Sequence, residues 1–358
     1  RIEREQDRHE VRSAANERYA PVYEVASRWR ETSLGAGRSL IDPSTLVWLP
    51  EAAADLKHRF VDSFDESARS FAEKLDDQMA AASQEACLLM ADLMYMHFLP
   101  LRSVGAQRKL DNINAVGFLA PEPFEVPETL EEPLGLGMIN GGAGYNTNRF
   151  YLVSLLIEFS VVWSGLEEER RLAILSDPWE FKQLLVDLPQ ERAGAQRNAV
   201  LFLLYPEVFE DIAANGHKKR IVSAFPADAG ESADLDRQVL SIRNALKPAQ
   251  GDDFSWYSDA VRPQWDKQKA ASKPRKRDST ATEDIEEIFP DPADRQTIAE
   301  VLADAVDLAH GINPNSWSVS RRHDGITLNV ANNRMLGLFP SEDLGFGVTV
   351  ASNDESQA

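Results

Sequence analysis

The sequence predicts a mainly α-helical protein, with multi-helix N-terminal and central regions and a small C-terminal α+β module that contains a β-hairpin. Three observations lead to this prediction. Apolar residues recur at helical spacing along most of the chain, and two apolar runs have the length of buried helices. Only the last part of the chain alternates apolar and polar residues as strands do.

The N-terminal helical region is expected to span 1–120. Its first 30 residues predict one helix that restarts after Pro21, and 51–82 place their apolar residues on one amphipathic face. The stretch 121–145 is rich in proline and glycine, so we expect an irregular connection there and a boundary between two helical regions.

Two apolar runs, Ala86–Leu99 and Phe150–Trp163, invite comparison with membrane spans. Both are shorter than the roughly 20 residues that cross a bilayer, and they contain the acids Asp92 and Glu158. We therefore expect two buried core helices. His97 lies among large apolar residues, which favours a hydrogen-bonded core histidine over a metal ligand.

A central helical domain is expected over 146–266, built from shorter helices. Asp177 and Pro178 have the residue types of an N-cap followed by proline at the first helical position. The expected helices are 146–163, 167–175, 179–188, 195–204, 206–214, 218–225 and 235–246.

The composition changes after this domain. Residues 267–287 begin with the basic run Lys267–Arg277 and then become acidic, which predicts a solvated charged linker. The small α+β module over 288–350 should contain a helix at 293–310. It should also contain a hairpin with strands at 316–320 and 326–330, joined by a turn with Asp-Gly. The polar tail 351–358 is expected to be disordered.

Charge and cysteine content restrict the function. The chain has 38 Lys+Arg against 58 Asp+Glu, a formal net charge of −20, so non-specific binding to nucleic acid or anionic lipid would need a local basic patch. A single cysteine, Cys87, excludes an intrachain disulfide and a cysteine-rich zinc site. With no secretory signal at its start, we expect a soluble, cytoplasmic chain without a membrane partner. The first residue is Arg rather than Met, which suggests a fragment or a trimmed start.

Motifs of catalysis and cofactor binding are missing from the sequence. The glycine-rich stretch Gly135–Gly144 has no Lys-Ser/Thr pair and no preceding strand, so a flexible connection is favoured over a nucleotide site. The histidines are scattered, and no Gly-x-Ser-x-Gly elbow occurs. We expect no cofactor and no metal in this chain, and whether it is an enzyme stays open.

One fragment is reminiscent of a nuclease motif, in which two carboxylates and a lysine converge on a metal ion. It consists of Asp177, Glu180 and Lys182. Glu180 and Lys182 are two positions apart, so on a helix they point to different faces, and a surface helix is the favoured interpretation. Cys87 is expected to serve packing rather than nucleophilic chemistry.

The candidate site residues form one basic cluster, His217, Lys218, Lys219 and Arg220, at the start of an expected helix. Backbone N–H groups and positive side chains could together hold a phosphate of DNA there, whereas the plainer interpretation is a solvated polar face. Lys267–Arg277 could follow a nucleic-acid backbone, but a flexible tether explains this run equally well.

The most distinctive segment runs from Asp177 to Phe225. It contains, in order, a leucine-rich stretch, an aromatic residue followed by proline, then Phe-Glu, His-Lys, an isoleucine and a phenylalanine. The residues at these places are Leu203, Leu204, Tyr205, Pro206, Phe209, Glu210, His217, Lys218, Ile221 and Phe225. This pattern resembles the region upstream of the motor domain in McrB-like AAA+ proteins, the nucleotide-driven subunits of modification-dependent restriction systems. The resemblance extends over 84–265, while the family's nucleotide-hydrolysing module is absent from this chain.

The resemblance implies a role in prokaryotic anti-phage defence. An N-terminal region of this kind would recruit DNA or another trigger to an AAA+ motor domain and a partner nuclease subunit outside this chain. The rival hypothesis is an acidic protein-interaction adaptor that does not bind nucleic acid, which the net charge favours. The third and weakest hypothesis is a nuclease that uses Asp177, Glu180 and Lys182.

Overall fold

The computed structural model describes residues 10–63, 71–139, 145 and 148–266, together with four strands between 317 and 350. The chain divides into two compact units, Arg1–Lys269 and Ala270–Ala358. The division falls inside the stretch 267–287 that the sequence predicts as a charged linker, although that stretch lies outside the described residues.

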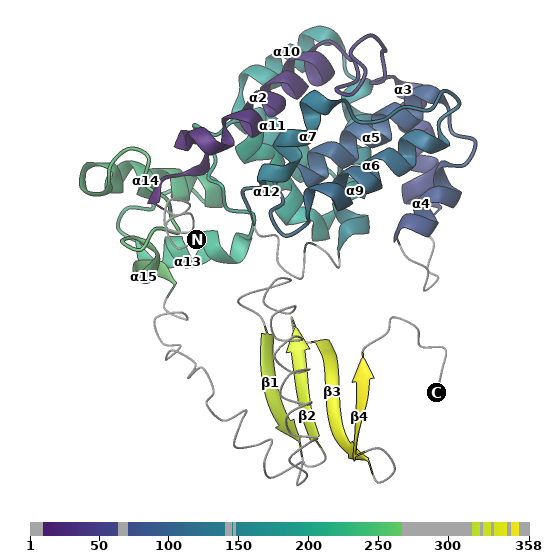
Figure 1. The fold of residues 1–358 in the computed structure, drawn as a ribbon. Coiled ribbons are helices and arrows are strands. Elements are labelled where there is room, and N and C mark those ends of the chain that lie inside the picture. Colours follow the sequence, from purple (N-terminus) through teal and green to yellow (C-terminus); the bar gives the residue numbers. More distant parts are fainter. Residues whose placement is uncertain are drawn as a thin grey trace. The chain divides into compact units, whose positions relative to one another are not determined.

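The first unit is built from helices, so the prediction of a mainly helical protein is confirmed for its described residues (Figure 1). Short helical turns extend or join these helices. They are 3₁₀ turns at Ser13–Ala15, Glu17–Tyr19 and Glu191–Ala193 (η5) and π-helical turns at Trp29–Gly35 (η3) and Lys57–Asp62. The α-helices are α2 Ala20–Arg28, α3 Pro50–Leu56, α4 Phe71–Met79, α5 Gln84–Phe98, α6 Ala106–Leu119, α7 Glu128–Leu136, α9 Arg149–Ser164, α10 Glu168–Ser176, α11 Pro178–Asp187, α12 Gly194–Leu204, α13 Asn215–Ala224, α14 Leu235–Gln250 and α15 Arg262–Trp265.

Helices α5 and α9 form the centre of the main core, as their apolar sequences predict (Figure 1). All residues of α5 from Ala86 onward are buried. The one acid among them, Asp92, accepts hydrogen bonds from Leu40 N at 2.7 Å and Ser39 Oγ at 3.0 Å. Among the described helices, none is both long enough and apolar enough to cross a membrane.

Aromatic rings join the outer helices to this centre. Trp29 of η3 lies 5.9 Å from Trp48, measured between ring centroids, and Trp48 lies 5.9 Å from Phe159 of α9. Phe159 continues the cluster to Trp163 and Phe181, so that η3, α9 and α11 share one set of rings. Large buried rings contribute most of the apolar area that stabilises such a core.

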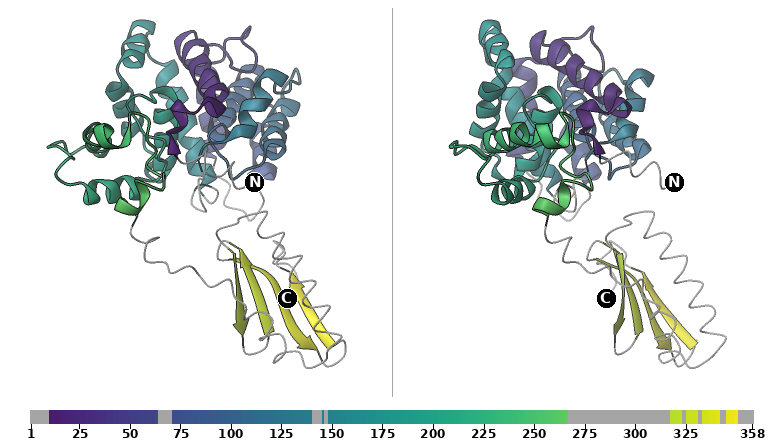
Figure 2. Two further views of the ribbon diagram at one scale, coloured as in Figure 1. Left: turned by 60° about the vertical axis from the view of Figure 1, so that its left-hand side comes forward. Right: turned by 90° about the vertical axis from the view of Figure 1, so that its left-hand side faces the viewer.

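A second, smaller core lies between α13, α14 and the segment that leads into α15. Its buried side chains include Ile212, Ile221, Val239, Ile242, Phe254, Trp256 and Trp265. The three helices stay together, in green, in both views of Figure 2. The N-terminal segment reaches this core, because Arg12 N donates to Asp253 O at 2.8 Å and Ser255 N donates to Glu10 O at 3.1 Å.

Two predicted elements differ from the structure. The stretch 121–145, expected to be irregular, contains helix α7, which buries Leu130 and Leu134 one turn apart and keeps Pro133 inside. Conversely, the helix expected at 206–214 does not form. The chain makes turns there instead, because the buried side chains of Phe209 and Ile212 contribute to the two different cores.

The described part of the second unit is an antiparallel sheet with strand order β1-β2-β3-β4. Its strands are β1 Trp317–Arg322, β2 Gly325–Val330, β3 Asn333–Ser341 and β4 Gly345–Val350, and the β2–β3 register shifts at Leu328/Asn329. The helix expected at 293–310 and the tail 351–358 lie outside the described residues. The α+β module therefore stays a prediction.

Candidate functional site

The four candidate residues His217, Lys218, Lys219 and Arg220 all lie in the first half of α13. Consecutive side chains on an α-helix point about 100° apart, so four in a row cannot share one surface. The structure separates them accordingly. Lys219 is exposed, His217 and Arg220 are half-buried, and Lys218 has only 1% of its surface exposed.

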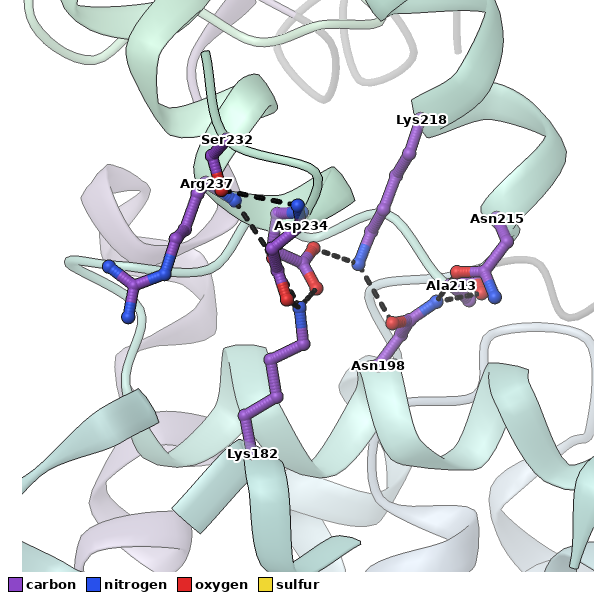
Figure 3. A network of polar contacts seen from close by, with 9 residues as sticks. Lys182, Asn198, Ala213, Asn215, Lys218, Ser232, Asp234 and Arg237 are labelled. Atoms are coloured by element: carbon purple, nitrogen blue, oxygen red, sulfur yellow. Dashed lines mark hydrogen bonds and ion pairs between the residues drawn. The ribbon is translucent and has the colours of Figure 1, made fainter. Parts of the chain in front are cut away.

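Lys218 is the centre of a buried polar network (Figure 3). Its ammonium group donates to Asp236 Oδ1 at 2.5 Å and to Asn198 Oδ1 at 2.8 Å. A second lysine, Lys182, approaches from α11 and contacts Asp234 Oδ1 at 2.6 Å and Asp236 Oδ2 at 2.7 Å. Two ammonium groups thus face two carboxylates, and the network carries no net charge.

The start of α14 explains why the two aspartates lie side by side. Asp234 is the N-cap of this helix and accepts hydrogen bonds from the backbone N–H groups of Asp236 and Arg237 at 2.9 and 3.1 Å. Aspartate is favoured at an N-cap because its carboxylate satisfies N–H groups that have no partner within the helix. Asp236 follows in the first turn, where the positive end of the helix dipole also stabilises a carboxylate.

The network connects the two cores of the helical unit. Lys182 and Asn198 belong to α11 and α12, whose apolar side chains lie in the main core. Lys218 and Asp236 belong to α13 and α14, which form the smaller core. Asn198 also donates from Nδ2 to Ala213 O at 2.7 Å, on the segment between the cores.

The charges of the network depend on one another. Burial acts to raise the pKa of Asp236, but the contacts with Lys218 and Lys182 outweigh it and hold that pKa below its usual value. The carboxylate is therefore ionised at neutral pH and supplies the counter-charge that the buried Lys218 needs. An ammonium group that is enclosed and neutralised in this way does not reach the phosphate of an approaching DNA strand.

His217 and Arg220 are held by an aromatic pair at the end of the helical unit. His217 Nδ1 lies 2.9 Å from Tyr257 Oη, and its ring centroid is 5.3 Å from that of Trp265. Burial, reinforced by Arg220, lowers the pKa of His217, so its imidazole is neutral at pH 7. The Arg220 guanidinium lies over the Trp265 ring, and Asp266 is 3.8 Å from its Nη2.

The three residues of the nuclease-like fragment do not converge. The Asp177 carboxylate caps α11 by accepting from Trp179 N at 2.8 Å, and Glu180 pairs with Arg170 at 2.8 Å. Lys182 points the other way, into the network with Asp236. Within the described residues, no three His, Cys, Asp or Glu side chains group as they would around a metal ion.

Two single-residue predictions are confirmed. His97 is buried and its Nδ1 lies 2.8 Å from Gln196 Oε1, and burial lowers its pKa to about 3. Cys87 is buried, and burial raises the pKa of its thiol to about 11, which leaves little of the nucleophilic thiolate at neutral pH.

The resemblance pattern falls on residues that hold the fold together. Leu203, Leu204, Tyr205 and Phe209 are buried in the main core. Glu210, also buried, forms an ion pair with Arg243, whose guanidinium lies 4.2 Å from the Phe254 ring centroid. Sequence reasoning had not singled out Asn198, Asp234 or Asp236. Of these three residues, only Asp234 could have been predicted from the sequence, because an aspartate directly before an amphipathic helix is a typical N-cap.

Comparison of the chain with protein-family models, with curated proteins and with solved structures gives no match.

Proposed function

We propose that this chain is a recognition and scaffolding region that works by binding protein partners. The proposal rests on the fate of the basic run on α13: its central lysine, Lys218, is enclosed in a neutral buried network, while acids outnumber bases by 20 in the whole chain. Because the buried network is neutral, the net charge of −20 belongs to the rest of the chain, and a strongly negative protein repels nucleic acid and attracts basic protein surfaces.

The McrB-like pattern gives this proposal a biological setting. In that setting the partners are an AAA+ motor domain and a nuclease subunit of a restriction system, and the helical unit positions them relative to a trigger. This setting is supported by the sequence pattern of 177–225, whose buried residues contribute to both hydrophobic cores. A restriction system of this kind is expected to act in the cytoplasm.

DNA recognition is the second candidate, and Lys219 favours it as an exposed base on α13 with the half-buried Arg220 beside it. Two cations support far weaker electrostatic binding than the six to ten phosphate contacts typical of DNA-binding proteins. A DNA-binding function would therefore need basic residues beyond this cluster.

A DNA titration separates the two candidates. Fluorescence anisotropy with plain and modified duplexes at low salt should show no saturable binding by the full chain. Binding that weakens in a Lys219→Ala, Arg220→Gln variant, with a shallower dependence on salt, would establish DNA recognition instead. An exposed pair elsewhere, Arg170→Gln with Arg237→Gln, is the matched control.

The protein-partner proposal has its own test. Size-exclusion chromatography of the full chain with the AAA+ and nuclease subunits of its restriction system should give a co-eluting complex that dissociates at high salt. Separate elution of all components at low salt would contradict the proposal.

A further inference from the structure

Lys218 touches a side-chain amide as well as a carboxylate inside the polar network between the two cores (Figure 3). Its Nζ donates to the amide oxygen of Asn198, Oδ1, at 2.8 Å and to Asp236 Oδ1 at 2.5 Å. The three residues come from α13, α12 and α14, and all of them are buried. One amine therefore contacts both an amide carbonyl and a carboxylate in a place that is closed to water.

The Asn198 amide is fixed in its orientation by two further contacts. Its Nδ2 donates to Ala213 O at 2.7 Å and to Asn215 Oδ1 at 2.8 Å, so both amide hydrogens are used and the oxygen faces Lys218. The carbonyl carbon, Cγ, is one C=O bond, about 1.2 Å, from that oxygen. A small shift of the lysine side chain thus brings Nζ within the roughly 3–3.5 Å at which two reacting atoms meet before a bond forms.

The surroundings of Lys218 favour its reactive form. Burial lowers the pKa of Lys218, against the opposing effect of the Asp236 carboxylate. An amine is a nucleophile only when it is neutral, so burial raises the reactive fraction of Nζ. The ionised Asp236 carboxylate contacts Nζ directly and is therefore placed to accept the proton that the amine must lose.

We propose that Lys218 and Asn198 become joined by an isopeptide bond, with Asp236 as the catalytic residue that transfers the protons. Nζ attacks Cγ of Asn198, so that the Nζ–Cγ bond forms and the Cγ–Nδ2 bond breaks. Asp236 passes two protons, one after the other, from the Lys218 ammonium to Nδ2. An ammonium ion leaves, one hydrogen stays on the new amide nitrogen, and no oxidant or co-reactant is required. This inference is independent of the proposed scaffolding function.

The second lysine of the network does not have the same choice of partners. Lys182 contacts the carboxylates of Asp234 and Asp236, and an ionised carboxylate resists attack by an amine because it would have to expel an oxygen anion. After the reaction Lys182 remains as the counter-charge of Asp236. The new bond would join α12, whose apolar side chains lie in the main core, to α13 of the smaller core.

Mass spectrometry of the full chain tests the proposal. The purified protein should be lighter than its sequence by one ammonia, about 17 Da. Trypsin releases the unlinked segment as 198–218, whereas a linked Lys218 resists cleavage and the peptide extends to Lys219. Further cleavage after Glu207 or Glu210 should then leave two pieces that stay joined.

Two separate pieces from the parent protein, even after prolonged incubation of the folded chain, would overturn the proposal. This outcome includes loss of ammonia at Asn215, because Asn215 and Lys218 lie on the same piece and a change there joins nothing.

Three variants assign the roles of the side chains, and circular dichroism checks that each one folds. Lys218→Arg keeps a cation beside Asp236 but removes the amine, so its pieces should separate and its mass should equal its sequence. Asp236→Asn keeps the shape of the side chain without the proton acceptor, and linkage should be slower by roughly a hundredfold in a time course. Lys219→Arg, at the exposed neighbouring lysine, is the matched control and should be linked like the parent. Joined pieces in Lys218→Arg, or a parent-like rate in folded Asp236→Asn, would contradict the proposal.

Discussion

Lys218 and Lys219 are adjacent in the sequence and differ in almost every structural respect. Lys218 is enclosed and paired with Asp236, whereas Lys219 is exposed and has no ion-pair partner among the described residues. A charged residue at such a buried position contributes to stability through its partner, and its removal leaves a carboxylate with too few contacts. At the exposed position the same side chain contributes mainly to solubility.

Substitution of the two lysines should therefore have unequal effects. Lys218→Ala is expected to lower the free energy of unfolding by about 3 kcal/mol, because Asp236 loses one of its two ammonium partners and Asn198 loses a donor. Lys219→Ala should change it by less than about 0.5 kcal/mol. Urea unfolding followed by circular dichroism measures both, and similar small effects would show that the network is not a stabilising element.

Asp92 provides a prediction of pH dependence. It is fully buried on α5, and burial raises its pKa from 3.8 to about 7 against the opposing effect of its hydrogen bonds. Since the folded pKa exceeds the unfolded one, this group stabilises the fold fully below about pH 4, and the contribution is lost as the pH rises through 7. Comparison of the parent with Asp92→Asn by urea unfolding should show a parent advantage that shrinks between pH 5 and pH 8. A constant difference across that range would exclude the titration.

At the scale of elements, the segment after α6 depends on a close approach of two backbones. A Cβ atom on Gly117 would lie 2.1 Å from Phe124 O, while Gly117 O accepts from Phe124 N at 3.3 Å. The turn that leads from α6 toward α7 can therefore pack only against a glycine. Gly105, just before the same helix, has nothing within 4 Å of its Cβ position.

These two glycines form a matched pair. Gly117→Ala should lower the free energy of unfolding by about 2 kcal/mol, because the added methyl group must displace the Phe124 backbone. Gly105→Ala, at the N-cap of α6, should lower it by less than about 1 kcal/mol. Thermal or urea unfolding of both variants provides the comparison, and equal losses would contradict the close packing of Gly117 against Phe124.

The sequence predicted most helices because helical periodicity is a local property. The two apolar runs and the Asp177-Pro178 start identified α5, α9 and α11 correctly. Helix α7 was missed, since Pro133 and the neighbouring glycines are helix breakers by type, yet the burial of Leu130 and Leu134 outweighs them. The network of Lys182, Asp234 and Lys218 could not be predicted, because its members are separated by up to 52 positions and meet only through packing.

At the scale of the whole molecule, the chain has a division near Lys269. Both hydrophobic cores lie on the N-terminal side of it, and the four-stranded sheet lies on the other. A compact unit with its own cores has what it needs to fold alone.

A protein that ends at Lys269 should therefore unfold cooperatively with the same midpoint as the helical transition of the full chain. Calorimetry of the truncated and full-length proteins measures this. A truncated protein that is unfolded, or whose midpoint is many degrees lower, would show that the helical unit depends on residues after the division.

The pairing of the N-terminal segment with the smaller core affects how the protein emerges from the ribosome. Ser13 N donates to a carboxylate oxygen of Asp211, 198 positions later. At translation rates of about 5–20 residues per second, the early segment waits roughly 10 to 40 s for this acceptor to be synthesised. During that interval α13 and α14 have not been synthesised, so the helical unit can close on its N-terminal segment only after residues as late as Asp253 and Ser255 have been made.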